Sequence, residues 1–173
     1  MTPRWMLHLS TETGWRGGER QVWYLARGLS EAGIPQAVAA PAGSPLSAAC
    51  PQLGVDTLRL SARPLLHPLV LGGLARALRR RPGALLHAHT SRALDAARWL
   101  ERLAPCAGIV HTRRVAFPVR AAAKYRSACR RYVAISSAVA DGLRAAGTPD
   151  DRLCIIPSAV DFAPLAAATA VAS

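Results

Sequence analysis

The chain has 173 residues, and 51% of them are hydrophobic, which suits one domain with an aliphatic core and excludes an extensively disordered protein. The formal net charge of +12 comes almost entirely from arginine, so attraction to an anionic partner and a compositional bias toward arginine remain equal explanations. The four cysteines are scattered without a paired spacing, which argues against a disulfide framework or a cysteine-based zinc site.

The first half of the chain alternates short apolar segments with helical patterns. Residues 4–10 are predicted to form a strand, and residues 11–18 a loop that contains three glycines. Apolar residues then recur at helical spacing over residues 19–32, and Gly33 is a stop signal. The next elements expected are a strand at 35–40, a short helix at 46–53, a strand at 56–60 and a helix at 68–80.

The second half continues the same alternation. The elements expected are a strand at 84–88, a helix capped by Ser91, a strand at 108–111, a basic helix at 120–131, a strand at 132–135, a helix capped by Ser136 or Ser137, and a strand at 153–156. This order predicts an α/β fold with a doubly wound, mainly parallel sheet of about seven strands and helices on both faces. The domain is expected to span residues 1–161, and residues 162–173 form an Ala-rich tail or the start of an interdomain linker.

The loop after the first strand is the first candidate site, because parallel sheets bind ligands at the C-terminal ends of their strands. Gly17 and Gly18 precede Glu19 at a helix N-terminus, where backbone N–H groups can closely approach a phosphate or a sugar. The loop contains neither the GxGxxG dinucleotide pattern nor a Walker pattern. The alternative is a tight turn, with Glu19 complementing the helix dipole.

Histidines and arginines follow the fourth and fifth predicted strands. His87 and His89 point the same way along a strand, but no third metal ligand is evident, so hydrogen bonding at the sheet edge is the preferred interpretation. His111 ends the fifth strand and is expected to face the crevice. Arg113 and Arg114 follow it as partners for an anion, and a solvated basic loop is the alternative.

The segment at residues 131–161 carries a family resemblance. It reads RYVAISSAVADGLRAAGTPDDRLCIIPSAVD and resembles the end of the N-terminal domain in family 4 retaining glycosyltransferases of the GT-B fold. The opening Gly-Gly-Glu-Arg at 17–20 resembles that family's GGxE-type loop, and the histidines at 87, 89 and 111 fall where the family has strand-end histidines. The match runs through nearly the whole chain in order. One departure is Pro-Ser-Ala-Val-Asp at 157–161, where the family commonly has Pro-Asn-Gly-Val-Asp.

The resemblance implies an acceptor-side, Rossmann-like half of an enzyme that transfers a sugar from a nucleotide-diphosphate donor to a glycan or lipid-linked acceptor with retention. No cofactor and no metal are expected. The resemblance places Gly17, Gly18 and Glu19 beside the donor phosphates or sugar, and makes His111 the catalytic residue that contacts the transferring sugar. The acceptor-facing candidates are Arg16, Arg113, Arg114, His89 and Ser136.

The family's donor-binding C-terminal domain has no counterpart in these residues, so the chain alone is expected to be inactive unless that domain is supplied in cis or in trans. The alternative is a non-catalytic module whose basic helices at 69–81 and 120–131 attach to an anionic membrane surface, or which binds a partner chain. Nucleic acid is not an expected partner, because no recognition pattern accompanies the charge. No signal peptide is visible, so the expected location is cytoplasmic, with peripheral contact at the inner membrane surface.

Overall fold

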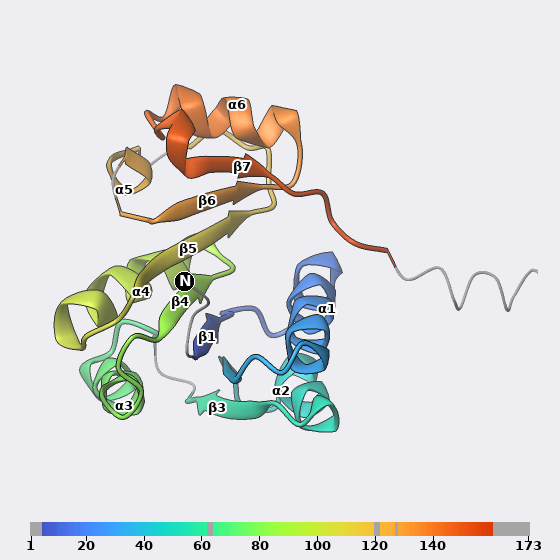
Figure 1. Cartoon of the computed structure of the whole chain (residues 1–173), viewed down its shortest axis with the longest axis vertical. Helices are drawn as coiled ribbons and strands as arrows, with labels where there is room; N and C mark the ends of the chain where they lie inside the picture. Colours follow the sequence, from blue (N-terminus) through green and yellow to red (C-terminus); the bar gives the residue numbers. More distant parts are fainter. Residues whose placement is uncertain (1–4, 62–63, 120–121, 127, 161–173) are drawn as a thin grey trace, which may run out of the picture.

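Seven parallel strands form one sheet in the order β3-β2-β1-β4-β5-β6-β7, in a computed structural model that describes residues 5–61, 64–119, 122–126 and 128–160 (Figure 1). The strands are β1 Met6–Leu9, β2 Gln36–Pro41, β3 Asp56–Leu60, β4 Leu85–Ala88, β5 Gly108–Arg113, β6 Arg131–Ala134 and β7 Leu153–Ile155. Every neighbouring pair is parallel, which confirms the predicted sheet.

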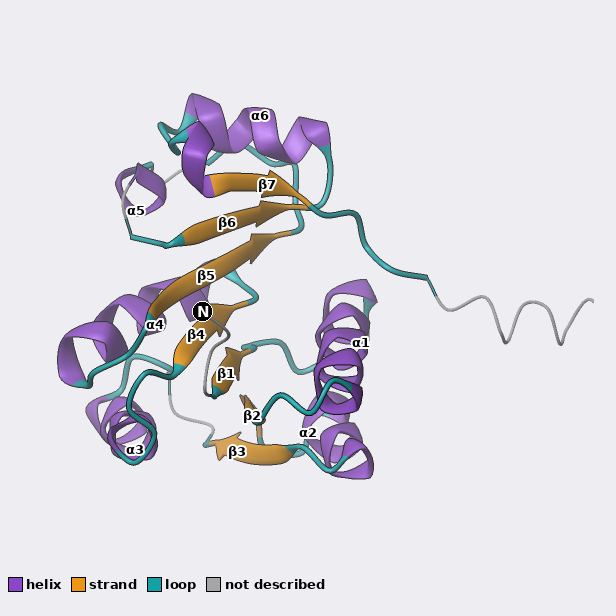
Figure 2. Ribbon diagram, viewed as in Figure 1, coloured by secondary structure: helices purple, strands orange, loops and turns teal. Residues whose placement is uncertain are grey.

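Helices cover both faces of the sheet, as predicted (Figure 2). They are α1 Gly17–Glu31, α2 Pro45–Ala49, α3 Pro68–Arg79, α4 Ser91–Leu103, α5 Ala123–Arg126 and α6 Ser137–Ala145, with 3-10 turns η1 Cys50–Leu53 and η2 Asp150–Arg152. The larger core packs α3, α4 and α6 on one face, and a smaller core packs α1 and α2 on the other. Strands buried on both faces explain the nearly continuous apolar runs in β1 and β2.

The order in which the chain adds strands to the sheet reverses beside β1. The chain runs from β1 outward to β2 and β3, and then returns to place β4 on the other side of β1. The loops that leave β1 and β4 therefore diverge and open a crevice at their carboxyl ends. Parallel register sets His8 opposite His87, and Ala88 opposite His111, so residues far apart in sequence meet at this edge.

Several predicted boundaries move. Helix α1 begins at Gly17 rather than at residue 19, and the cap of α4 is Thr90, whose Oγ1 accepts a hydrogen bond from the backbone N–H of Ala93 (3.1 Å). Strand β5 continues two residues beyond His111, to Arg113. The predicted tail at 162–173 and the domain boundary at residue 161 lie outside the described residues.

The prediction of a basic helix at 120–131 is wrong. In the described part of that range only Ala123–Arg126 is helical. The following backbone is held by the sheet instead, because Arg130 N–H donates to Ile109 O (2.8 Å) and Cys129 N–H donates to the Tyr132 hydroxyl (3.3 Å). Among the described helices, none is both long enough and apolar enough to cross a membrane.

Candidate functional site

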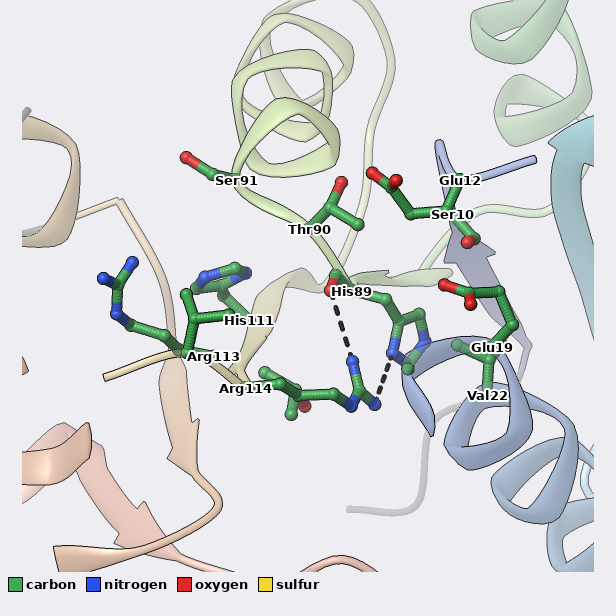
Figure 3. A pocket seen from close by; sticks show the side chains of 13 residues that line it. Ser10, Glu12, Glu19, Val22, His89, Thr90, Ser91, His111, Arg113 and Arg114 are labelled. Carbon is green, nitrogen blue, oxygen red and sulfur yellow. Dashed lines mark hydrogen bonds between the residues drawn. The ribbon is translucent and has the colours of Figure 1, made fainter. Parts of the chain in front are cut away.

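A pocket of about 260 Å³ lies at the carboxyl ends of β1, β4 and β5, beside the N-terminus of α1 (Figure 3). Six of the residues predicted from the sequence line it: Gly18, Glu19, His89, His111, Arg113 and Arg114. Ser10, Thr90 and Ser91 also line it and were missed, although Ser10 directly follows β1, Thr90 caps α4 and Ser91 is the first residue of that helix. The topology therefore brings most of the predicted groups to one edge of the sheet.

Three predicted residues are not in the lining of this pocket. Arg16 is the exposed N-cap of α1, and Gly17 is the first residue of that helix. Ser136 caps α6, where its Oγ accepts a hydrogen bond from Val139 N–H (3.4 Å). It follows β6, which lies one strand beyond the pocket-forming β5.

The N-terminus of α1 presents open space and backbone N–H groups to the pocket. A Cβ added to Gly18 would meet no atom within 4 Å, so packing within the chain does not require glycine there. Glycine in a helix costs up to about 1 kcal/mol relative to alanine, so stability alone does not explain why this position is glycine. Glu19 is buried, and its Oε2 accepts a hydrogen bond from the N-cap backbone N–H of Arg16 (2.8 Å).

His111 presents a hydrogen-bond acceptor. Its Nδ1 lies 2.9 Å from Ala88 O, and because a carbonyl only accepts, the proton is on Nδ1. Nε2 is then a lone pair, buried and without a hydrogen-bond partner in the structure. Burial is the main cause that lowers the pKa of His111 to about 4, and the Arg113 charge lowers it further, so the imidazole is neutral at physiological pH.

Arg113 is the last residue of β5 and Arg114 follows it. Their side chains point to opposite faces of the sheet, as alternation along a strand requires. Arg113 donates to the Tyr125 hydroxyl (3.2 Å) and to Phe117 O, so its guanidinium holds the loop that follows β5. Arg114 donates from Nη1 to His89 O and from Nη2 to His89 Nδ1, both at 3.2 Å (Figure 3).

The Arg114 guanidinium is a partly buried cation with spare donor capacity. Its Nε has no hydrogen-bond partner in the structure. Desolvation lowers the pKa of Arg114 to about 10, while the nearby Glu19 carboxylate acts in the opposite direction. The group thus stays charged at neutral pH, and an anion that enters the pocket would meet a cation that solvent screens poorly.

A third imidazole joins His87 and His89, which the sequence did not indicate. His8 of β1 packs against both rings, and one nitrogen from each of the three lies within 4.8 Å of the others. The chemistry of three neutral imidazoles suits a transition metal. Their nitrogens are already hydrogen-bonded, however: His8 Nδ1 to His89 Nε2 (3.0 Å), and His87 Nε2 to Thr112 Oγ1 (2.8 Å).

A second cavity, of about 430 Å³, opens on the β2 and β3 side of the same edge. Leu60, Leu65 and Leu66 give it an apolar wall, and Arg92 and Asp95 lie at its lining from α4. Thr11 in this cavity and Thr90 in the first pocket are joined by a hydrogen bond between their hydroxyls (2.8 Å). The two hollows are therefore neighbours along one rim.

Known proteins resemble this chain in sequence and in fold. The family model described as Glycosyltransferase Family 4 matches residues 15–163. A glycosyltransferase from Rickettsia africae ESF-5 has a similar structure, with a TM-score of 0.76 and 15% identity over 95% of this chain and 46% of that one. Anabaena HepE, solved in complex with UDP-glucose, gives a TM-score of 0.73 and 16% identity over 91% of this chain and 44% of its own.

The lipopolysaccharide outer core galactosyltransferase WaaB in its apo form is also similar, with a TM-score of 0.70 and 11% identity over 91% of this chain and 46% of WaaB. At these identities the likeness shows the fold alone. The chain spans less than half the length of each of these three structures. No curated protein matches the sequence significantly.

Proposed function

Because the chain belongs to glycosyltransferase family 4, we propose that it forms the acceptor-side wall of a cleft in which a sugar passes from a nucleotide-diphosphate donor to an acceptor with retention of configuration. The observation that supports this most directly is the pocket at the carboxyl edge of the sheet. A helix N-terminus, a partly buried guanidinium and an unpartnered imidazole nitrogen converge there. Together these groups suit a ligand that is anionic at one end and carries hydroxyl groups at the other.

The anionic end is proposed to be the donor diphosphate. The first-turn N–H groups of α1 have no partner within the helix and carry its positive dipole end. Arg114 adds a full charge from the opposite side of the pocket. Gly18 leaves the approach to the helix free of side-chain atoms.

His111 is proposed to hold the transferring sugar. With the proton committed to Ala88 O, its Nε2 accepts a hydrogen bond from a sugar hydroxyl rather than donating a proton. A neutral imidazole also avoids opposing the positive charge that builds at the anomeric carbon during transfer. Its role is therefore to bind and orient the reacting sugar.

The second wall is proposed to come from a donor-binding domain supplied in cis or in trans, and the chain alone is proposed to be inactive. HepE was solved with UDP-glucose, and this chain covers 44% of it. We propose no metal and no cofactor, since Arg114 and the α1 N-terminus already supply positive charge to the diphosphate. The cavity of about 430 Å³ is the proposed entrance for a glycan or lipid-linked acceptor, its leucines suiting an apolar portion.

The test is kinetic. The full chain is combined with a donor-binding domain from the same family, and transfer from UDP-glucose is measured. Arg114→Met removes a charged interaction of roughly 1.5–3 kcal/mol, so kcat/KM should fall about 10- to 100-fold. His111→Ala removes a neutral hydrogen bond of roughly 0.5–1.5 kcal/mol, so kcat/KM should fall about 2- to 10-fold. Arg59→Met, the same change on the distant edge strand β3, serves as the control. Wild-type rates in the His111 and Arg114 variants would contradict the proposal.

The location is proposed to be cytoplasmic, with peripheral contact at an anionic membrane. Support for the contact comes from α3, whose last turn carries Arg76 and Arg79, because only Ala123–Arg126 is helical among the described residues of the range 120–131. Vesicles of phosphatidylcholine with and without 30% phosphatidylserine would test it by co-sedimentation. Equal binding to vesicles with and without phosphatidylserine would contradict the proposed electrostatic contact.

A further inference from the structure

A continuous chain of hydrogen bonds, buried except for a partly buried last link at Arg114, connects the backbone of α1 with the pocket. It begins at Ala26 O, which accepts from Gln36 Nε2 (2.8 Å), and Gln36 Oε1 lies 3.1 Å from His8 Nε2. His8 Nδ1 lies 3.0 Å from His89 Nε2, and His89 Nδ1 lies 3.2 Å from Arg114 Nη2. The chain thus crosses from β2 through β1 to the residues that follow β4 and β5.

Both ends of this chain impose the same direction on every proton. A carbonyl only accepts, so the Gln36 amide nitrogen faces Ala26 and its oxygen must accept from His8 Nε2–H. A neutral imidazole has one N–H, so His8 Nδ1 accepts from His89 Nε2–H, and His89 Nδ1 is left to accept. Arginine only donates, which is what that last position needs.

The direction requires both imidazoles to be neutral, and the surroundings favour this. Burial lowers the pKa of His8 to about 4 and holds that of His89 well below its usual value. His87 and Arg114 lower the His89 value further by charge. A proton added to His8 Nδ1 would face an N–H of His89, and one added to His89 Nδ1 would face Arg114.

The groups that accept hydrogen bonds from the Arg114 guanidinium are uncharged. Carboxylates commonly hold buried arginines in place, but they also neutralise the charge. Here Arg114 donates its two hydrogen bonds to an imidazole nitrogen and a backbone carbonyl, which fix the side chain without adding a negative charge, and the nearby Glu19 carboxylate accepts from Arg16 N–H instead. Such an arrangement suits an arginine whose charge is meant for an incoming anion.

We propose that Gln36 and His8 are positioning residues, which act through His89 to orient Arg114 toward a diphosphate or similar anion. This rests on the proposed function in one respect, that Arg114 is the anion-binding group. Neither Gln36 nor His8 is in the lining of the pocket. Their effect on binding therefore passes through the hydrogen-bond chain.

The primary test uses the wild-type chain and needs no variant. Nitrogen-15 NMR at pH 7.5 reports which imidazole nitrogen carries each proton. We expect both His8 and His89 to be neutral with the proton on Nε2, and a hydrogen-bond scalar coupling between His89 Nε2 and His8 Nδ1. A proton on Nδ1 of either histidine overturns the proposal.

The second test measures pyrophosphate affinity by calorimetry. Gln36→Met keeps the side-chain length but removes both hydrogen bonds that the side-chain amide makes. We expect the dissociation constant for pyrophosphate to rise about tenfold, which is equivalent to the loss of one charge-assisted hydrogen bond. Gln21→Met is the matched control, because the Gln21 amide pairs with the backbone of Ala159 and takes no part in the hydrogen-bond chain to Arg114. Thermal melts establish that both variants are folded.

The outcomes separate this proposal from the proposed function. If Arg114→Met abolishes pyrophosphate binding while folded Gln36→Met binds as wild type does, the positioning role is refuted and the anion site stands. If the wild-type chain does not bind pyrophosphate, the anion site is contradicted, and the tautomers still decide the hydrogen-bond chain. Stoichiometric Co²⁺ that shifts the His8 and His89 nitrogen signals would identify a metal site and overturn the positioning role.

Discussion

Acid should destabilise this fold in a pH range where most proteins are little affected, because four histidines are buried in neutral form. His8, His87, His89 and His111 all have their pKa lowered, chiefly by burial. The unfolded chain binds protons at these residues near pH 6.5, whereas the folded chain does so only near pH 4 for His8 and His111. Their contribution to stability is complete above about pH 6.5 and is lost as the pH falls toward 4.

The magnitude follows from proton linkage. Between pH 7.5 and 5.5, one histidine with an unfolded pKa of 6.5 that stays neutral in the native state lowers the free energy of unfolding by about 1.4 kcal/mol. Four such residues lower it by about 5.6 kcal/mol, a large share of the roughly 5–15 kcal/mol typical of a domain. Aspartate and glutamate contribute little, because their ordinary pKa values lie below this range.

Urea unfolding followed by circular dichroism at pH 7.5 and 5.5 measures this difference. The variant His111→Gln removes one of the four groups and should reduce the difference by about 1.4 kcal/mol. Thr148→Val removes a buried hydrogen bond to Tyr125 O that involves no histidine, and it should shift stability equally at both pH values. Equal wild-type stability at the two pH values would refute the assignment of buried neutral imidazoles.

Three further predictions concern glycine and charge. Gly18→Ala should weaken pyrophosphate binding severalfold in calorimetry without unfolding the chain, whereas Gly17→Ala should not, because both sites have room for a Cβ and only Gly18 lines the pocket; equal effects would contradict the assignment. Glu19→Gln should lower stability by about 0.3–1 kcal/mol and tighten pyrophosphate binding, since it removes a carboxylate from a helix N-terminus beside the site, and weaker binding would be inconsistent with that. Gly108→Ala should cost about 1–3 kcal/mol in urea unfolding, because φ is +123° and the new Cβ would lie 3.0 Å from Arg130 Cδ; unchanged stability would disprove the strain.

The strand order limits how much of the site the sequence can predict. Alternating strand and helix patterns predict the parallel sheet, and residues that follow strands then become site candidates, which is how His89 and His111 were found. His8 and Gln36 lie within strands and face neighbours that only the β2-β1-β4 order provides. Ser136 follows a strand too, but that strand lies one position too far along the sheet.

Side-chain direction and tertiary contacts account for the other differences. Arg113 and Arg114 are predicted as a pair, yet consecutive strand residues point to opposite faces, so Arg113 holds a loop and Arg114 bonds to His89 at the proposed anion site. The segment at 120–131 has a helical composition, but the backbone N–H groups of Arg130 and Cys129 donate to the sheet and to the Tyr132 hydroxyl. Local propensity is overridden there by tertiary hydrogen bonds.

The most direct test of the central claim is a crystal structure of the chain assembled with a donor-binding domain of its family and UDP-glucose. We expect a diphosphate oxygen within hydrogen-bonding distance of the Arg114 guanidinium, and a glucose hydroxyl donating to His111 Nε2. A nucleotide sugar seated at another part of the chain, in contact with neither Arg114 nor His111, would contradict the assignment of this pocket as one wall of the transfer site.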